Sequence, residues 1–136
     1  MPMTDHAAER AGAILTVDLD AVRANYRLLR ALGAQDGGKA ACAAVLKADA
    51  YGLGMPQVAQ ALLREGCRSF FVAHLDEGIR LRQLVPEDCT IYVMHGAMPG
   101  AARDCFQHDL APVLNDPGQV AEWRALAHGL GRVLPA

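Results

Sequence analysis

The sequence predicts an α/β protein in which a parallel sheet is covered by helices. Short apolar stretches of four to seven residues alternate along the chain with amphipathic stretches of about ten. The apolar stretches have no polar face, which is typical of strands buried on both sides. Parallel strands need long crossover connections, and the amphipathic stretches supply them as helices.

The first predicted elements are a strand and a helix. Ala13 to Val17 is expected to form the opening strand. Asp18 and Asp20 follow as candidate N-caps of a helix that ends at about Leu32. The apolar stripe of this helix consists of Val22, Tyr26 and Leu29.

A loop, a strand and a second helix come next. The stretch Gly33 to Gly38 is a loop by composition, and Ala40 to Leu46 is expected to be a strand buried on both faces. Pro56 stands where the first turn of a helix tolerates proline, and Gly66 is placed just past the end of that helix. The helix buries Val58, Ala61 and Leu62.

The rest of the chain continues this alternation. Strands are expected at Phe70–Ala73, Thr90–Met94 and Leu110–Leu114. Helices are expected at Asp76–Val85, at Pro99–Gln107, and from an Asn115 cap through Val120, Trp123 and Leu126 to about Gly129. Arg132–Ala136 then has the composition of a further buried strand.

Two architectures fit this order of elements. A doubly wound open sheet could be complete in 136 residues, whereas an eight-stranded barrel needs roughly 250 and would be about half built. The chain ends on Arg132–Ala136 without a turn or a polar tail, which favours the unfinished barrel.

Composition argues against several classes of partner. Thirteen Lys and Arg against fifteen Asp and Glu give a net charge of −2 with no block of one sign, so neither nucleic acid nor an anionic membrane is expected. Residues 1–12 lack the apolar core of a signal peptide, and no run is long enough to span a bilayer. The four cysteines form no Cys-x-x-Cys pair, which favours free thiols in a reducing cytoplasm.

Lys47 is the most informative candidate for chemistry. It follows the apolar run Ala43–Leu46, and functional side chains of parallel α/β folds gather at such C-terminal strand ends. Partial burial there would favour the neutral amine, which is the form that condenses with an aldehyde. Gly52 and Gly54 allow close approach of a ligand, and the positive end of the helix at Pro56 is expected to favour a phosphate.

Less specific interpretations compete with this one. A single lysine at a strand end is more often a solvated terminus, and the two glycines make neither a dinucleotide fingerprint nor a phosphate loop. His74 and His95 each follow a predicted strand, but no carboxylate or further histidine stands at metal-ligand spacing, so no metal site is expected. Cys42 and Cys105 have no neighbouring base and are expected to be unreactive.

One long segment and four shorter ones carry a family pattern. The long segment is Val45–Gly54, with the sequence Val-Leu-Lys-Ala-Asp-Ala-Tyr-Gly-Leu-Gly. The shorter segments are Val17–Tyr26, Phe71–Gly78, Ile91–Gly96 and Pro112–Asn115. In sequence, order and spacing they resemble the alanine racemases, a family of barrel-type pyridoxal phosphate enzymes. The resemblance covers nearly the whole chain from about Ala13.

This resemblance implies a fold and two site residues. The fold is a partial (β/α)8 TIM-type barrel, about its first half, with residues 1–136 as the N-terminal portion of the barrel domain and the family's C-terminal β domain absent. By position, Lys47 would form the internal aldimine with pyridoxal phosphate, and Tyr51 would donate a hydrogen bond to the cofactor phosphate. Asp49 and Leu53 stand where the family often has Asn and His, a departure that is expected to leave the role of the lysine intact.

The implied reaction interconverts L-alanine and D-alanine, a peptidoglycan precursor, in a cytoplasmic homodimer. Lys47 would be one of two acid/base groups, and the other would be a tyrosine of the later β domain, contributed by the partner subunit. None of Tyr26, Tyr51 and Tyr92 matches that tyrosine. We therefore expect the chain alone to have no useful racemase activity, and to expose strand edges and apolar surface that favour aggregation.

Three alternatives stay open at this point. One is another barrel-type pyridoxal phosphate enzyme, either an amino acid racemase or a decarboxylase. Another is a non-catalytic pyridoxal phosphate-binding protein, against which the Tyr51–Gly54 segment counts. The last is a complete open-sheet domain without a covalent cofactor.

Overall fold

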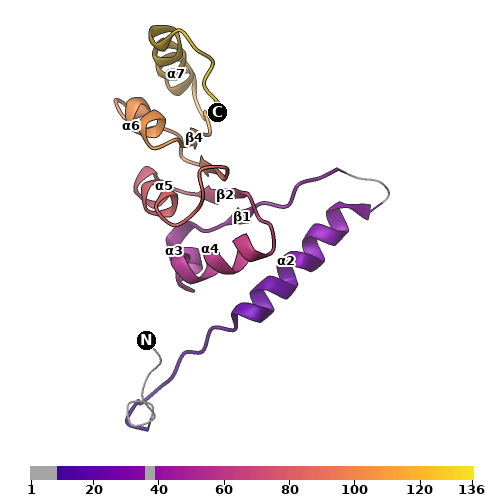
Figure 1. Ribbon diagram of the computed structural model, residues 1–136. Helices are drawn as coiled ribbons and strands as arrows, with labels where there is room; N and C mark the ends of the chain where they lie inside the picture. The colour runs from indigo at the N-terminus through magenta and orange to yellow at the C-terminus, as the bar shows by residue number, and fades with distance from the viewer. Residues whose placement is uncertain (1–8, 36–38) are drawn as a thin grey trace.

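The computed structural model describes residues 9–35 and 39–136, which form a parallel sheet with helices beside it (Figure 1). Expectations that concern residues 1–8 and 36–38 lie outside the described residues. In chain order the elements are α2 (Leu19–Gly33), β1 (Ala44–Val45), α3 (Lys47–Tyr51), α4 (Met55–Arg64), β2 (Ser69–Val72), α5 (Leu75–Arg82), β3 (Thr90–Val93), α6 (Ala102–Gln107), β4 (Ala111–Pro112) and α7 (Pro117–Leu130).

The strands pair in the order in which they occur along the chain. The sheet runs β1-β2-β3-β4, and every pair is parallel. A helix stands between each strand and the next, so the sheet is a series of consecutive strand–helix units. The order never reverses, as the two halves of a doubly wound sheet would require. The predicted α/β fold with about half of a barrel wall is therefore confirmed.

One face of the sheet forms the core. The side chains on that face have no exposed surface: Phe70, Val72, Ile91 and Val93. The helices α4, α5 and α6 are stacked along this side of the strands in Figure 1. On the opposite face Val45 is 40% exposed, and the rings of Phe71 and Tyr92 stack with their centroids 4.6 Å apart. The expectation of strands buried on both faces is thus met on one face only. In a closed barrel the second face would line the interior.

Helix α2 packs against α4 and lies away from the sheet (Figure 1). Asp18 is its N-cap, and one carboxylate oxygen of Asp18 accepts hydrogen bonds from two backbone amides of the first turn, at 2.9 and 3.0 Å. Tyr26 is the buried residue of this helix. The Glu65 carboxylate at the end of α4 accepts from Arg23 at 2.6 Å and from Arg27 at 2.9 Å, which ties the two helices together.

Four expected strands are wrong or too long. The strand expected at Leu110–Leu114 shortens to the two residues of β4, since only these have register partners on β3. Ala13–Val17 forms no strand, and Ile14 and Leu15 are 60% and 81% exposed, because no backbone lies beside this segment to pair with it. The strand expected at Ala40–Leu46 shortens to the two residues of β1, since only these have register partners on β2. Arg132–Ala136 also forms no strand, because the segment turns back and Leu134 packs on the core.

Several helix ends are close to the expected positions, but α5 ends at Arg82 and not at Val85, and α6 begins at Ala102 and not at Pro99. One cap is also corrected. Pro56 lies in the first turn of α4, and Gly66, with a φ of +84°, follows the end of that helix. Asn115 does not cap α7, because Asp116 does so by accepting from the amide of Gln119 at 2.9 Å. Among the described residues, no helix combines the length and the apolar content that crossing a membrane would require.

Candidate functional site

Lys47 lies where the first strand leaves the sheet. The amide of Leu46 still donates to the carbonyl of Phe71 at 2.8 Å, so sheet pairing extends to the residue before the lysine. The Lys47 side chain is half-buried, and its Nζ lies 5.9 Å from the centroid of the Tyr51 ring. The structure therefore brings the two predicted site residues together at the C-terminal edge of the sheet.

The turn that joins these two residues is left-handed. Ala48, Asp49, Ala50 and Tyr51 have φ values of +51°, +56°, +55° and +57°. For L-residues this conformation costs roughly 1–2 kcal/mol per residue, and such strain persists where the surroundings impose it, commonly at functional sites. The amide of Ala50 donates to the carbonyl of Leu46 at 2.9 Å and closes the turn. Local sequence gives no signal for this feature, because none of these residues is glycine.

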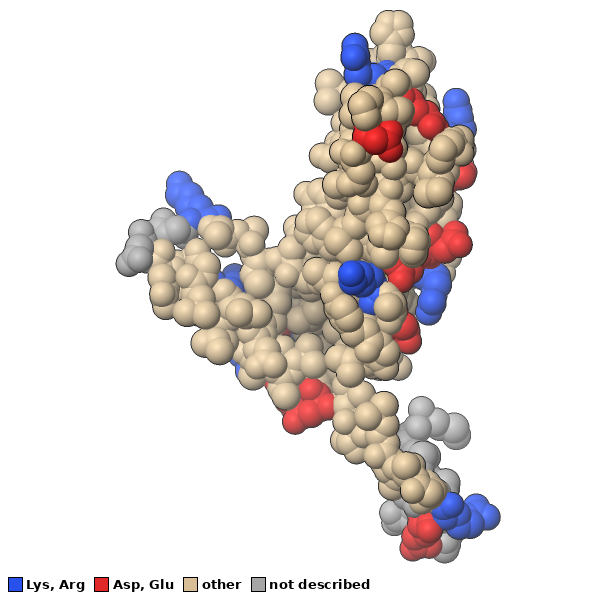
Figure 2. Space-filling model, turned by 180° about the vertical axis from the view of Figure 1, so that it is seen from behind, with Lys and Arg blue, Asp and Glu red and all other residues tan. Residues whose placement is uncertain are grey.

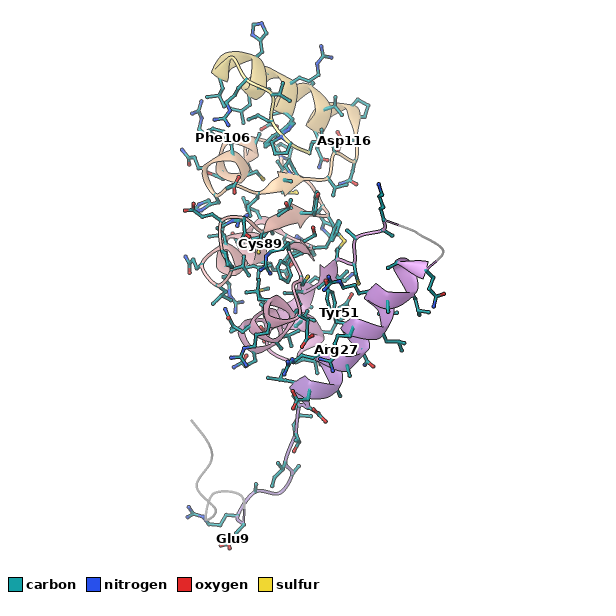
Figure 3. The ribbon with its side chains drawn as sticks, turned by 45° about the vertical axis from the view of Figure 1, so that its right-hand side comes forward. Glu9, Arg27, Tyr51, Cys89, Phe106 and Asp116 are labelled. Atoms are coloured by element: carbon teal, nitrogen blue, oxygen red, sulfur yellow. The ribbon has the colours of Figure 1, made fainter. Side chains whose placement is uncertain are left out.

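Asp49 contacts the helix end that is expected to favour a phosphate. Its Oδ1 accepts from the amide of Met55 at 2.9 Å, so a carboxylate already occupies the N-terminus of α4. One amide at the positive end of this helix is thus paired within the chain. The Tyr51 side chain is 62% exposed; Figure 3 labels it.

Glu77, at the start of α5, connects the lysine turn to the next strand. Its Oε1 accepts from the amide of Ala48 at 2.7 Å, and its Oε2 accepts from the amides of Ala73 at 2.8 Å and His74 at 3.1 Å. From the sequence we expect Glu77 only at a helix start, where its charge suits the helix dipole. The partner Ala48 lies 29 residues away, so no local pattern could have revealed the contact.

His74 and His95 meet at the ends of β2 and β3. Their rings pack edge to face, with centroids 4.5 Å apart. The placement of both at the same edge agrees with the expectation drawn from the strand ends. Within residues 9–35 and 39–136, no three His, Cys, Asp or Glu side chains are grouped so that they could hold a metal ion.

The four cysteines are all free. Burial raises the pKa of the Cys67 and Cys89 thiols, and it raises the pKa of Cys105 to about 11. These thiols therefore stay protonated near neutral pH and are poor nucleophiles. Cys105 is unreactive in this sense, as expected from the sequence.

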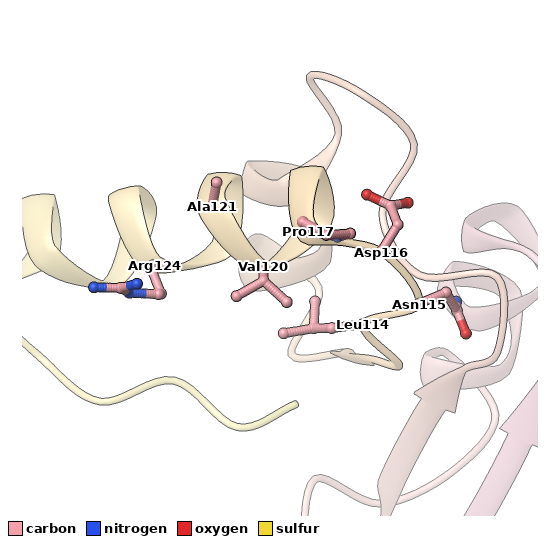
Figure 4. A pocket seen from close by; sticks show the side chains of 7 residues that line it. All are labelled: Leu114, Asn115, Asp116, Pro117, Val120, Ala121 and Arg124. Carbon is pink, nitrogen blue, oxygen red and sulfur yellow. The ribbon is translucent and has the colours of Figure 1, made fainter.

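Two cavities lie away from Lys47. One, of about 810 Å³, separates the start of α2 from α4 and is lined by Thr16, Val17, Asp18, Leu19, Asp20, Arg23, Pro56, Gln57, Gln60, Ala61 and Arg64. The other, of about 580 Å³, is lined by Leu114, Asn115, Asp116, Pro117, Val120, Ala121 and Arg124 (Figure 4). Figure 2 shows that the surface between α2 and the body of the molecule is hollowed and mostly uncharged. The candidate site is thus an open edge of the sheet and not an enclosed cavity.

Comparison with known proteins identifies the family of the chain. The family model described as the N-terminal domain of alanine racemase matches residues 17–136. The chain belongs to the alanine racemase family. The catabolic alanine racemase of Mesorhizobium japonicum is 51% identical over 93% of the chain, and the alanine racemase of Brucella ovis is 48% identical over the same share. The chain spans about a third of the length of these alanine racemases, 32% and 31% respectively.

Solved alanine racemases share the same arrangement of elements. The crystal structure of the Bartonella henselae alanine racemase, with covalently bound pyridoxal phosphate, superposes with a TM-score of 0.78 at 36% identity, covering 85% of this chain and 31% of that one. The Streptomyces coelicolor alanine racemase gives 0.74 at 30% identity, covering 85% of this chain and 30% of that one. The described sheet and helices therefore correspond to part of the alanine racemase fold.

Proposed function

We propose that residues 1–136 form the N-terminal, lysine-bearing portion of the barrel domain of an alanine racemase, and that Lys47 binds pyridoxal phosphate covalently. The observation that carries this proposal is the placement of a half-buried primary amine at the C-terminal edge of the sheet, beside the ring of Tyr51. The covalently bound cofactor of the similar Bartonella henselae enzyme supports it.

The side chains at this edge suit the two reactive ends of the cofactor. The Lys47 amine suits the aldehyde, because the two condense to a C=N bond with release of one water. The Tyr51 hydroxyl, 62% exposed, suits the phosphate as a hydrogen-bond donor. Asp49 is turned to the amide of Met55, so its carboxylate is already paired. Further phosphate contacts would have to come from outside these residues.

When bound, pyridoxal phosphate supplies an electron sink for the negative charge that remains when an α-proton leaves alanine. Lys47 Nζ would be the group of this chain that accepts and returns that proton on one face. Racemisation needs a second acid/base group on the opposite face, and the tyrosines of this chain do not supply one. The Tyr26 hydroxyl donates to the carbonyl of Cys42, and Tyr92 is stacked on Phe71.

From the family resemblance, we propose that the partner subunit of a homodimer supplies the second group and that this chain alone does not racemise alanine. The substrate assignment rests on the named activity of the similar proteins. The four free thiols are compatible with a reducing compartment such as the cytoplasm, where D-alanine would serve as a peptidoglycan precursor.

The proposal is tested by adding pyridoxal phosphate to the purified chain and recording visible absorbance. The sequence contains two lysines, Lys39 and Lys47, so each serves as the control for the other. We expect an absorbance change on condensation that persists in Lys39→Ala and is lost in Lys47→Ala. Equal signals from the two variants would contradict the role of Lys47. Conversion of L-alanine to D-alanine by the chain, abolished by Lys47→Ala, would contradict the proposed inactivity.

A further inference from the structure

We infer that Glu77 is a positioning residue, which sets the orientation of Lys47 through the backbone amide of Ala48. This inference rests on the proposed function of Lys47. Glu77 lies on α5 rather than on the lysine turn, yet its Oε1 accepts from the Ala48 amide at 2.7 Å. That is the shortest of the three bonds its carboxylate makes with backbone amides.

The contact acts on Lys47 because a peptide unit is planar. The Ala48 N–H belongs to the same rigid plane as the carbonyl and the Cα of Lys47. A hydrogen bond that fixes the direction of this N–H therefore fixes the plane from which the lysine side chain departs. The same turn is strained, with φ of +51° at Ala48, and an external anchor is what such a conformation requires.

The other carboxylate oxygen of Glu77 binds the backbone of the neighbouring strand end. It accepts from the amides of Ala73 and His74, which directly follow β2. One carboxylate thus connects the peptide plane after β1 to the backbone after the neighbouring strand. The sheet sets the position of both strands, so the lysine is held relative to the sheet and not only by its own flexible turn.

The charge state of Glu77 agrees with this geometry. Burial by itself raises the pKa of its carboxyl, but the backbone amides of Ala48, His74 and Ala73 outweigh burial, and the net pKa is lowered. The group therefore stays ionised near neutral pH and accepts all three bonds.

The test compares two lysines in one molecule. The dilute chain is incubated with pyridoxal phosphate, the adducts are reduced with borohydride, and mass spectrometry gives the ratio of modified Lys47 to modified Lys39. Exposed Lys39 reports intrinsic amine reactivity. We expect Glu77→Gln to lower this ratio about tenfold, since misplacement of a reacting group by about an ångström has effects of this order or larger. The matched control is Asp76→Asn, which removes a charge from the same helix turn without touching the Ala48 anchor.

The ratio is taken per folded molecule, with folding followed by circular dichroism, so that a loss of stability alone does not change it. If Glu77→Gln does not fold, the same ratio is measured in Glu77→Asp. The aspartate keeps the charge at the start of α5 but is too short to reach both strands. A variant at Glu77 that keeps the wild-type ratio would overturn the inference, as would an equal loss in Asp76→Asn. A wild-type chain without preference for Lys47 would instead refute the proposed function on which the inference depends.

Discussion

At the scale of single residues, Tyr26 shows how one hydroxyl stabilises the fold. The side chain is 7% exposed, and its hydroxyl donates to the Cys42 carbonyl at 2.9 Å, which joins α2 to the segment that enters β1. Tyr26→Phe removes the donor and leaves a carbonyl without its partner. We expect the free energy of unfolding to fall by about 1 kcal/mol. Urea denaturation measures it, with exposed Tyr51→Phe as the control that changes little.

The same residue predicts how stability depends on pH. Burial is the main cause that raises the pKa of Tyr26 well above its ordinary value of 10.0. Above about pH 10 the unfolded chain loses this proton while the native chain keeps it, so stability present at lower pH is lost as the pH rises. Urea titrations on both sides of this pH should show a decline that is shallower in Tyr26→Phe. Identical declines in the two proteins would exclude Tyr26 as the cause.

Single site residues were predictable from the sequence to different degrees. Lys47 and Tyr51 follow from the motif, and the structure places them beside one another. The role of Asp49 as the partner of the α4 amide could not be predicted, because the bond depends on the path of the turn between Asp49 and Met55. The bond from Ala48 to Glu77 depends on the pairing of β1 with β2, which only the fold reveals.

At the scale of elements, the left-handed turn predicts that an alanine-to-glycine substitution, which usually destabilises a helix, will here stabilise the fold. Glycine adopts positive φ without steric cost, so Ala48→Gly should remove strain from a residue with φ of +51°. We expect unfolding to cost up to about 1 kcal/mol more in this variant. The matched control is Ala24→Gly, at another exposed alanine in the middle of α2. This substitution should lower the free energy of unfolding by about 1 kcal/mol. Destabilisation of equal size at both positions would contradict the strained turn.

Most elements were predictable because segments that pack in the core are rich in apolar residues. The apolar runs at β2 and β3 and the amphipathic stretch at α4 stand out in the sequence. The segment Ala13–Val17 has the same apolar character but no strand beside it, and pairing is a property of the whole fold. The left-handed conformation of α3 could not be predicted either, because alanine normally favours the right-handed helix.

At the scale of the whole molecule, the described surface carries apolar side chains that a folded partner would cover. Leu28, Leu29 and Leu32 on α2 are 60%, 59% and 50% exposed, and Val45 on the sheet is 40% exposed. We expect the isolated chain to self-associate as its concentration rises, which size-exclusion chromatography with light scattering measures.

Replacement of the α2 leucines tests whether this surface is responsible. Leu28→Glu combined with Leu32→Glu should shift the chain towards monomer, whereas Ala24→Glu, on the same helix, should not. A compact monomer with a cooperative melt in the unmodified chain would contradict the expected self-association.

The central claim is that this fold presents Lys47 to pyridoxal phosphate, and peptide mapping tests it most directly. The chain is mixed with the cofactor, reduced with borohydride and digested, and each peptide is then weighed. The account predicts that the added mass lies on the peptide that contains Lys47 and greatly exceeds any on Lys39. Modification spread evenly over both lysines, or concentrated on Lys39, would contradict it.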